Sequence, residues 1–242
     1  MPKDNLPAVR TASDLTITFP DRNLHITQEE AIKTRELIVS KGAYTPDGRA
    51  YINKEALPHL LSTDMKGVNR IYNDLGSEDK LELGDQKLIS VPAVNKEISK
   101  RIEEPRDTLV RERLRDSEAC INSLRDAPEL EKYREAEESR NRREQPLLKA
   151  KKIKAENLSA CQLTGDPLKP NAHAHHIERQ ADKPRKSRDL ENIIIANPEP
   201  HTEIHRQGAE SPSELQSLCE KKGWNNPLAS SSTFQDTTDA DK

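Results

Sequence analysis

A long, charged stretch from position 93 to position 155 is rich in residues that favour helices, and it separates the two ends of the sequence. Three prolines interrupt it, at Pro105, Pro128 and Pro146. Proline removes a backbone donor and clashes with the preceding turn, so each one predicts a break between helices. The middle of the chain is therefore expected to be a series of helices.

One of these helices carries a narrow apolar stripe. Val110, Leu114, Ile121 and Leu124 recur at intervals of 4, 7 and 3 residues in an otherwise charged segment. Side chains at these intervals share one face, which is typical of a helix that packs against another helix. The partner helix can belong to the same chain or to a second copy, so a homodimer through residues 93–156 is one of two alternatives.

The composition favours several small hydrophobic cores over one large core. Of the 242 residues, 32% are hydrophobic and 3% aromatic, whereas 33% are charged, and such a chain buries little apolar surface per residue. We expect an α+β protein that is mainly helical overall. The expected parts are a small α+β domain at 1–92, a charged helical linker or oligomerisation region at 93–156, a compact module at 157–208, and a short helix with a disordered acidic tail at 209–242.

The cysteines and the N-terminal residues favour an intracellular, cytoplasmic protein. Cys120, Cys161 and Cys219 are odd in number and widely spaced, which fits neither a disulfide framework nor a CxxC zinc site. We expect all three to be small core residues. The first residues lack the apolar segment of a signal peptide, and no stretch approaches roughly 18 apolar residues, so no membrane association is expected.

The N-terminal part alternates short strands and short helices. Leu15–Phe19 and Leu24–Ile26 flank a turn and are expected to form a hairpin. Thr27 and Glu30 have the spacing of a capping box, which predicts the start of a helix that Gly42 ends. A short strand at 50–52 is expected to follow.

A later helix is predicted to begin after Thr63 or Asp64 as N-cap and to end at Gly76. Its apolar face is expected to consist of Met65, Val68, Tyr72 and Leu75. Lys66 and Arg70 lie off this face and have side chains suited to bases and phosphates.

The order of elements at 1–92 is helix, strand, helix, helix and a hairpin of Leu81–Leu83 with Leu88–Val91. This is the order of a winged-helix unit, whose third helix enters the major groove of DNA. Lys66 and Arg70 would then contact DNA. The alternative is a small α+β domain whose helix has a solvated face.

Five of the seven histidines lie within 33 residues, at positions 173, 175, 176, 201 and 205. Asn197 and Pro198 form a strong helix start, with asparagine as N-cap and proline in the first turn, and Gly208 supplies a stop. His201 and His205 are therefore expected one turn apart on a helix, where two imidazoles can bind one metal ion.

The other histidines lie in a predicted strand that follows the loop at 164–167. Alternation along a strand places His173 and His175 on one face and His176 on the other. Asn192 precedes a second, apolar strand at 193–195. The expected unit is thus strand, loop, strand and helix, and a metal between the strands and the helix would stabilise so small a core.

A basic loop connects the two predicted strands. Against the single Asp182, the segment 179–188 carries Arg179, Lys183, Arg185, Lys186 and Arg188. Because these charges lie between candidate metal-binding residues, we expect them to contact phosphates of a nucleic acid.

Paired histidines on a first strand, Asn192 before the second and two histidines on a helix resemble the HNH (ββα-metal) endonuclease motif. The spacing is similar to that of the nuclease domains of DNase-type colicins, over about residues 158–206. The resemblance implies that His175, His201 and His205 bind one divalent metal ion.

The resemblance also implies that His176 is the general base that activates water, a task that suits imidazole at physiological pH. Asn192 would hydrogen-bond backbone groups across the loop and fix the base in place. The metal would stabilise the phosphate and the departing 3′ oxygen, and the products would carry 5′-phosphate and 3′-hydroxyl ends.

Two positions depart from the family pattern. Colicin-type sites have an acidic residue where this chain has His173, so an alternative register with His173 and His175 as co-facing ligands stays open. Cys161 stands near the first position of a zinc knuckle that this chain does not complete.

The residues leave the identity of the metal open. Three imidazoles favour Zn²⁺ or Ni²⁺ by affinity, whereas Mg²⁺ or Mn²⁺ could support catalysis at cellular abundance.

The sequence thus predicts a metal-dependent HNH endonuclease, an enzyme that hydrolyses phosphodiester bonds in DNA, with RNA as the alternative substrate. The second hypothesis is a non-catalytic DNA-binding regulator that retains the fold as a metal-stabilised module.

Overall fold

The computed structural model describes residues 8–228 and divides the chain into two compact units, which meet between residues 137 and 138. Both units combine helices with antiparallel strands, and helices predominate, so the expected α+β class is confirmed. Within the described residues, no helix is both long and apolar enough to cross a membrane. The expected disordered tail lies largely outside the described residues.

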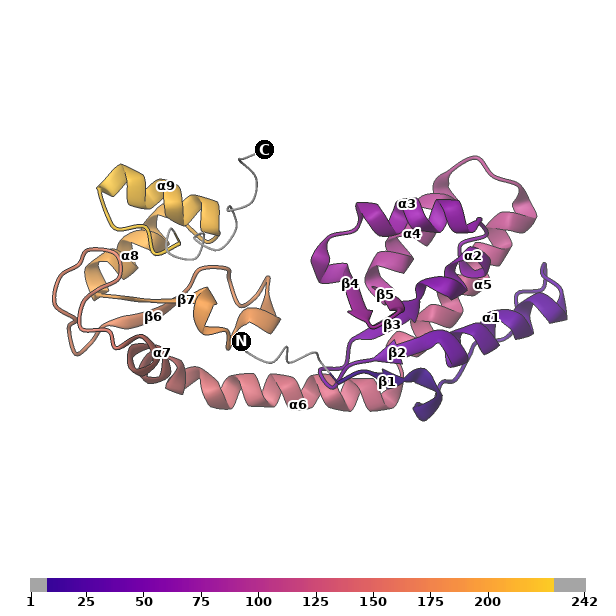
Figure 1. Cartoon of the computed structure of the whole chain (residues 1–242), viewed down its shortest axis with the longest axis horizontal. Helices are drawn as coiled ribbons and strands as arrows, with labels where there is room; N and C mark the ends of the chain where they lie inside the picture. The colour runs from indigo at the N-terminus through magenta and orange to yellow at the C-terminus, as the bar shows by residue number, and fades with distance from the viewer. Residues whose placement is uncertain (1–7, 229–242) are drawn as a thin grey trace, which may run out of the picture. The chain divides into compact units, whose positions relative to one another are not determined.

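The first unit is built on an antiparallel sheet in the order β1-β2-β3-β5-β4 (Figure 1). Its strands are β1 Arg10–Thr11, β2 Gly42–Tyr44, β3 Ala50–Asn53, β4 Lys80–Leu83 and β5 Gln86–Ser90. Ile52 and Ile89 point into the main core, whereas Tyr51 and Leu88 belong to a smaller cluster. The alternation expected of strands therefore divides the sheet into two apolar faces.

Helices pack on the sheet of the first unit and complete its main core. They are α1 Gln28–Lys41, α2 Leu57–Leu60, α3 Met65–Asp74, α4 Val91–Glu103 and α5 Thr108–Arg125. The capping box that begins α1 is present: Thr27 Oγ1 accepts from Glu30 N, and Glu30 Oε2 accepts from Thr27 N. Asp64 caps α3 by accepting from Gly67 N at 2.8 Å.

The hairpin expected at Leu15–Phe19 and Leu24–Ile26 does not form. The side chains of the first segment pack on the main core, and the backbone N–H of Thr16 donates to Glu129 Oε1 at 3.2 Å. Leu24 is 85% exposed. The segment therefore packs against the core of the first unit and bonds Glu129, without a partner strand.

The apolar stripe of α5 lies in the main core of its own unit. Leu114, Ile121 and Leu124 are fully buried there, and Val110 packs beside them. Helices α4 and α5 thus belong to the first unit and contribute to its main core. The boundary expected near residue 92 is accordingly not where the structure divides, and the stripe no longer argues for a dimer.

Helix α6 Pro128–Glu144 runs through the division, and α7 Leu148–Glu156 belongs to the second unit. The prolines at 105, 128 and 146 all lie at helix boundaries, as expected. On α3, Val68 and Tyr72 are buried, but Met65 is 43% exposed and does not join the expected apolar face. Its place in the first turn puts it beyond the edge of the core.

The second unit consists of a strand pair between helices (Figure 1). The strands are β6 His173–His176 and β7 Ile193–Ala196, and the helices after them are α8 Pro198–Gln207 and α9 Pro212–Lys222. All of β7 is buried: Ile193 and Ile195 join a cluster with α7, whereas Ile194 and Ala196 join the cluster of α8 and α9. The run of three isoleucines thus reflects burial on both faces.

Cys120, Cys161 and Cys219 are all buried and free, in agreement with the expectation that they are small core residues.

Candidate metal centre

Strand β6 directs its histidines to two sides. It pairs antiparallel with β7, with His175 opposite Ile194 and His176 opposite Ile193. The rings of His173 and His175 both approach His201 of α8, whereas His176 contacts the loop before β7. Alternation along the strand explains this division.

Helix α8 begins and ends where its sequence predicts. Pro198 lies in its first turn, and Gly208 ends it in the left-handed region at φ 63°. The side chain of Asn197 does not cap the helix, contrary to expectation. It accepts from Lys169 N at 2.9 Å and donates to Pro167 O at 3.2 Å, so it anchors the loop before β6 to the start of α8.

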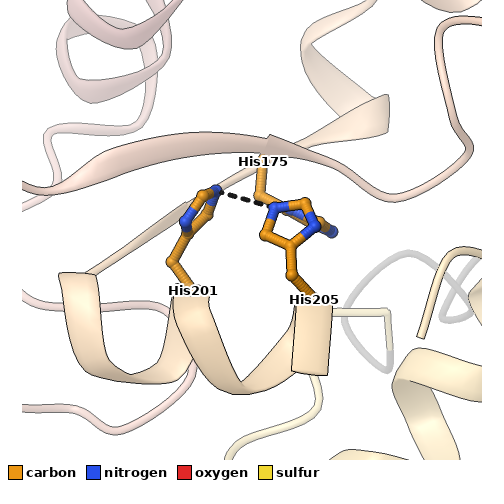
Figure 2. Close-up of side chains that lie close together, drawn as sticks. All are labelled: His175, His201 and His205. Atoms are coloured by element: carbon orange, nitrogen blue, oxygen red, sulfur yellow. Dashed lines mark hydrogen bonds between the residues drawn. The ribbon is translucent and has the colours of Figure 1, made fainter. Parts of the chain in front are cut away.

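Three histidines converge between β6 and α8 (Figure 2). One ring nitrogen from each of His175, His201 and His205 lies within 4.8 Å of the others. The Nε2 atoms of His201 and His205 are 3.3 Å apart. Two nitrogens bound to a tetrahedral metal at about 2.05 Å would be separated by about 3.3 Å, so this pair has the spacing of two ligands.

The burial of His175 supports a metal-binding role. The residue is 7% exposed, and its Nε2 atom is buried with no hydrogen-bond partner in the described part of the chain. A buried polar atom without a partner is costly and needs an explanation. A metal ion held with His201 and His205 would supply the missing partner, and three imidazoles suit a divalent ion such as Zn²⁺ or Ni²⁺.

The pKa values of His175 and His201 are lowered. Burial, with the nearby charges of His201, His205 and His176, lowers the pKa of His175 to about 4. Burial, with the charges of His173 and His205, lowers the pKa of His201 to about 4. Both rings are therefore neutral at pH 7, the form that a metal requires.

His173 lies beside the three histidines without joining them. Its ring stacks on His201, with centroids 4.5 Å apart and planes at 16°. It is exposed, whereas His175 is buried. The ring of His175, by contrast, meets both His201 and His205 edge-on. The geometry thus favours the set of His175, His201 and His205 over the alternative register.

His176 is oriented by a main-chain group that the sequence does not reveal. Its Nε2 lies 2.9 Å from the carbonyl oxygen of Ser187. A carbonyl oxygen only accepts, so Nε2 carries the proton, and in the neutral ring Nδ1 is left with a lone pair. Any residue type could offer this carbonyl, which is why no pattern in the sequence points to Ser187.

Asn192 joins the two ends of the loop between the strands. Its Oδ1 accepts from Glu178 N at 2.8 Å, and its Nδ2 donates to Glu178 O at 3.1 Å and Lys186 O at 3.2 Å. These are backbone bonds of the kind that the resemblance implies. Because Lys186 precedes Ser187, the same bonds hold the carbonyl that orients His176.

The basic loop is less positive than its own composition indicates. Arg179 pairs with Glu210 at 2.8 Å, Lys186 pairs with Glu178, and Arg188 lies 3.6 Å from Glu144. These carboxylates come from outside 179–188, so counting charges within the segment missed them. Exposed ion pairs are weak, at about 0 to 1 kcal/mol, so phosphates could replace the carboxylates.

The other basic residues proposed to contact nucleic acid lie in both units. Lys183 and Arg185 are exposed in the loop of the second unit. Lys66 and Arg70 are exposed on α3 of the first unit.

Comparison of the chain with known proteins finds no matching family model, no matching curated protein and no matching solved structure.

Proposed function

We propose that the second unit is a metal-dependent endonuclease centre of the HNH type, which hydrolyses phosphodiester bonds in DNA. The observation that carries the proposal is the convergence of His175, His201 and His205 beside a fourth histidine, His176, that is oriented by a carbonyl. Three metal ligands alone would also fit a purely structural metal site. His176, an oriented imidazole on the same strand as His175, adds a group that can act as a general base.

His176 would act through Nδ1. With its Nε2 proton donated to Ser187 O, the neutral ring can take a proton from a water molecule at Nδ1. The oxygen of that water attacks phosphorus, the bond from phosphorus to the 3′ oxygen breaks, and solvent supplies the proton for the 3′-hydroxyl. The products carry 5′-phosphate and 3′-hydroxyl ends.

Asn192 acts as a positioning residue in this proposal, since it bonds only backbone groups of the loop. A divalent metal bound by His175, His201 and His205 would stabilise negative charge on the phosphate and on the departing oxygen. The basic loop would contact neighbouring phosphates through Arg179, Lys183, Arg185, Lys186 and Arg188.

The first unit would deliver the centre to DNA. The observed order is α1, β2, β3, α2, α3 and the β4–β5 hairpin, and apart from the additional strand β2 it supports a winged-helix role for the first unit. Lys66 and Arg70, on the exposed side of α3, would contact DNA in that arrangement.

A screen of purified full-length protein tests the proposal. Supercoiled plasmid, single-stranded DNA and RNA are each incubated with Mg²⁺, Mn²⁺, Ni²⁺ or Zn²⁺, and the products are separated on gels. We expect cleavage of DNA with at least one metal, and none in EDTA. Binding of metal and DNA without cleavage under any condition would instead support the non-catalytic regulator.

A further inference from the structure

Three lysines of the first unit gather around one aromatic ring. The Nζ atoms of Lys54, Lys80 and Lys87 lie 5.0, 5.1 and 5.3 Å from the centre of the Tyr72 ring. Any two of these ammonium groups are therefore within about 10 Å of each other, and like charges so close repel. The three lysines and Tyr72 are called the lysine cluster below.

The sheet explains how the cluster forms. Lys80 and Glu82 are two residues apart on β4, so their side chains share a face, and Lys87 lies opposite Glu82 on β5. Lys54 directly follows β3, the neighbour of β5. Tyr72 comes from α3, which packs over this face. The cluster thus depends on residues from four elements, which no single stretch of sequence reveals.

The cluster has an excess of positive charge. Glu82 accepts a hydrogen bond from the Tyr72 hydroxyl at 2.5 Å and lies 3.8 Å from Lys87 Nζ. One carboxylate thus offsets one of three ammonium groups. The side chain of Lys87 is 48% exposed, so the excess charge is open to solvent and to a ligand.

These lysines have two candidate roles, a structural role at the Tyr72 ring and a role in binding phosphate. Their ammonium groups lie over the ring of Tyr72, which is 5% exposed, but cation–π contact with one ring does not require three cations. Three compact ammonium groups suit phosphate oxygens, which lysine binds as a point charge. A nucleic acid duplex carries one charge per about 1.7 Å of its axis, about twice the density of an extended peptide in which every residue is acidic, at one charge per about 3.3 Å.

We infer that the lysine cluster is a phosphate-binding surface for the nucleic acid backbone, beyond the contacts assigned to Lys66 and Arg70 and independent of the metal centre. Lysine point charges do not read bases, so the surface binds without sequence preference. It anchors a polynucleotide at the junction of α3 and the β4–β5 hairpin.

The test measures the binding of a fluorescent DNA duplex to full-length protein by anisotropy in EDTA, over a series of salt concentrations. The double variant Lys80→Met/Lys87→Met keeps unbranched side chains of similar length but removes two charges. The slope of log affinity against log salt should become shallower by about 0.9 for each lysine removed. The matched control is Lys33→Met/Lys132→Met, which removes two exposed lysines elsewhere in the first unit.

Two further measurements separate a binding role from a structural one. Lys80→Arg/Lys87→Arg should restore most of the slope, because it restores the charge. Glu82→Gln keeps an acceptor for Tyr72 but removes the negative charge, so DNA should bind more tightly. A structural role predicts neither result.

The inference is overturned if the lysine-to-methionine variant keeps the wild-type slope, or loses no more than its control. It is also overturned if polyglutamate displaces DNA as effectively as unlabelled DNA does, since an acidic protein would then be the better partner. Because EDTA prevents metal-dependent cleavage, these outcomes are distinct from failure of the nuclease proposal.

Discussion

His175 combines three properties that fit a metal ligand. It is buried, its Nε2 atom has no partner among the described residues, and it lies in contact with two other imidazoles. An unpaired buried nitrogen costs about 1 to 3 kcal/mol. A small unit with little apolar core would not be expected to keep such a residue for packing alone.

Replacing one ligand should weaken metal binding strongly. The binding free energy of a structural Zn²⁺ ion with four protein ligands is about 10 to 16 kcal/mol, so each ligand contributes a few kcal/mol to it. We expect His205→Ala to lower the affinity for Zn²⁺ by about a hundredfold or more in isothermal titration calorimetry. The matched variant His173→Ala, at the stacked but exposed histidine, should keep one metal per chain. The reverse pattern would support the alternative register.

The lowered pKa values of His175 and His201 predict how the metal-free second unit responds to acid. Unfolded, both imidazoles titrate near pH 6.5, whereas in the folded unit both pKa values are about 4. Between these values the unfolded chain binds more protons, so stability falls as the pH is lowered from 6.5 towards 4.

Trp224 reports this effect, because it is the only tryptophan of the chain and packs against the core of the second unit. In EDTA, the urea midpoint of its fluorescence should be lower at pH 5 than at pH 7. The double variant His175→Gln/His201→Gln should lose most of the difference. An equal or higher wild-type midpoint at pH 5 would be inconsistent with the two lowered pKa values.

At the scale of elements, helix ends could be predicted well from sequence. Thr27 with Glu30 marked the start of α1, and Pro198 with Gly208 marked both ends of α8. These patterns depend on residues within one or two turns. The strand–loop–strand–helix order of the candidate site was predictable for the same reason, because each element has its own local pattern.

Long-range partners could not be predicted in this way. Leu15–Phe19 alternates like a strand, but its Thr16 N–H bonds to Glu129, 113 residues away. Asn197 had the pattern of a side-chain cap, but its amide bonds Lys169 and Pro167. In each case the prediction from the local pattern was wrong, because a contact distant in sequence determined the partner of the residue.

The packing of α5 gives a prediction for the first unit. Ile121 is fully buried in the core, whereas Leu109 on the same helix is 41% exposed. Ile121→Ala should destabilise the unit by about 2 to 5 kcal/mol in urea unfolding followed by circular dichroism. Leu109→Ala is the control and should lower the free energy of unfolding by well under half as much as Ile121→Ala does. If the stripe instead formed a dimer, Ile121→Ala would dissociate it in sedimentation experiments.

At the scale of the whole molecule, the chain has two units with separate cores, and the candidate ligands all belong to one of them. A ligand that binds only the folded form stabilises it, by about 2.7 kcal/mol at a hundred times its dissociation constant. Zn²⁺ should therefore raise the melting temperature of the second unit and leave that of the first unchanged.

Scanning calorimetry measures both melting transitions in one experiment, and Trp224 fluorescence assigns the transition of the second unit. The variant His205→Ala should abolish the shift with Zn²⁺. A shift of both transitions, or of neither, would count against a metal centre confined to residues 138–242.

The charged surfaces of the two units differ from what the charges along the sequence indicate. The net charge of the chain is −3, so contact with a polyanion has to come from local surfaces. The loop at 179–188 is partly neutralised by carboxylates from other elements, whereas the lysine cluster gains its charge from several elements. Neither result could be obtained by counting charges along the sequence.

The most direct test of the nuclease proposal compares wild type with His176→Ala in plasmid cleavage, with both proteins saturated with the same divalent metal. His176 bonds Ser187 O and is not among the three ligands, so the variant should bind metal with unchanged stoichiometry. General-base catalysis is worth about 10² to 10⁴ in rate, and we predict a loss of that size. Cleavage by His176→Ala at the wild-type rate would contradict the assignment of His176 as the base.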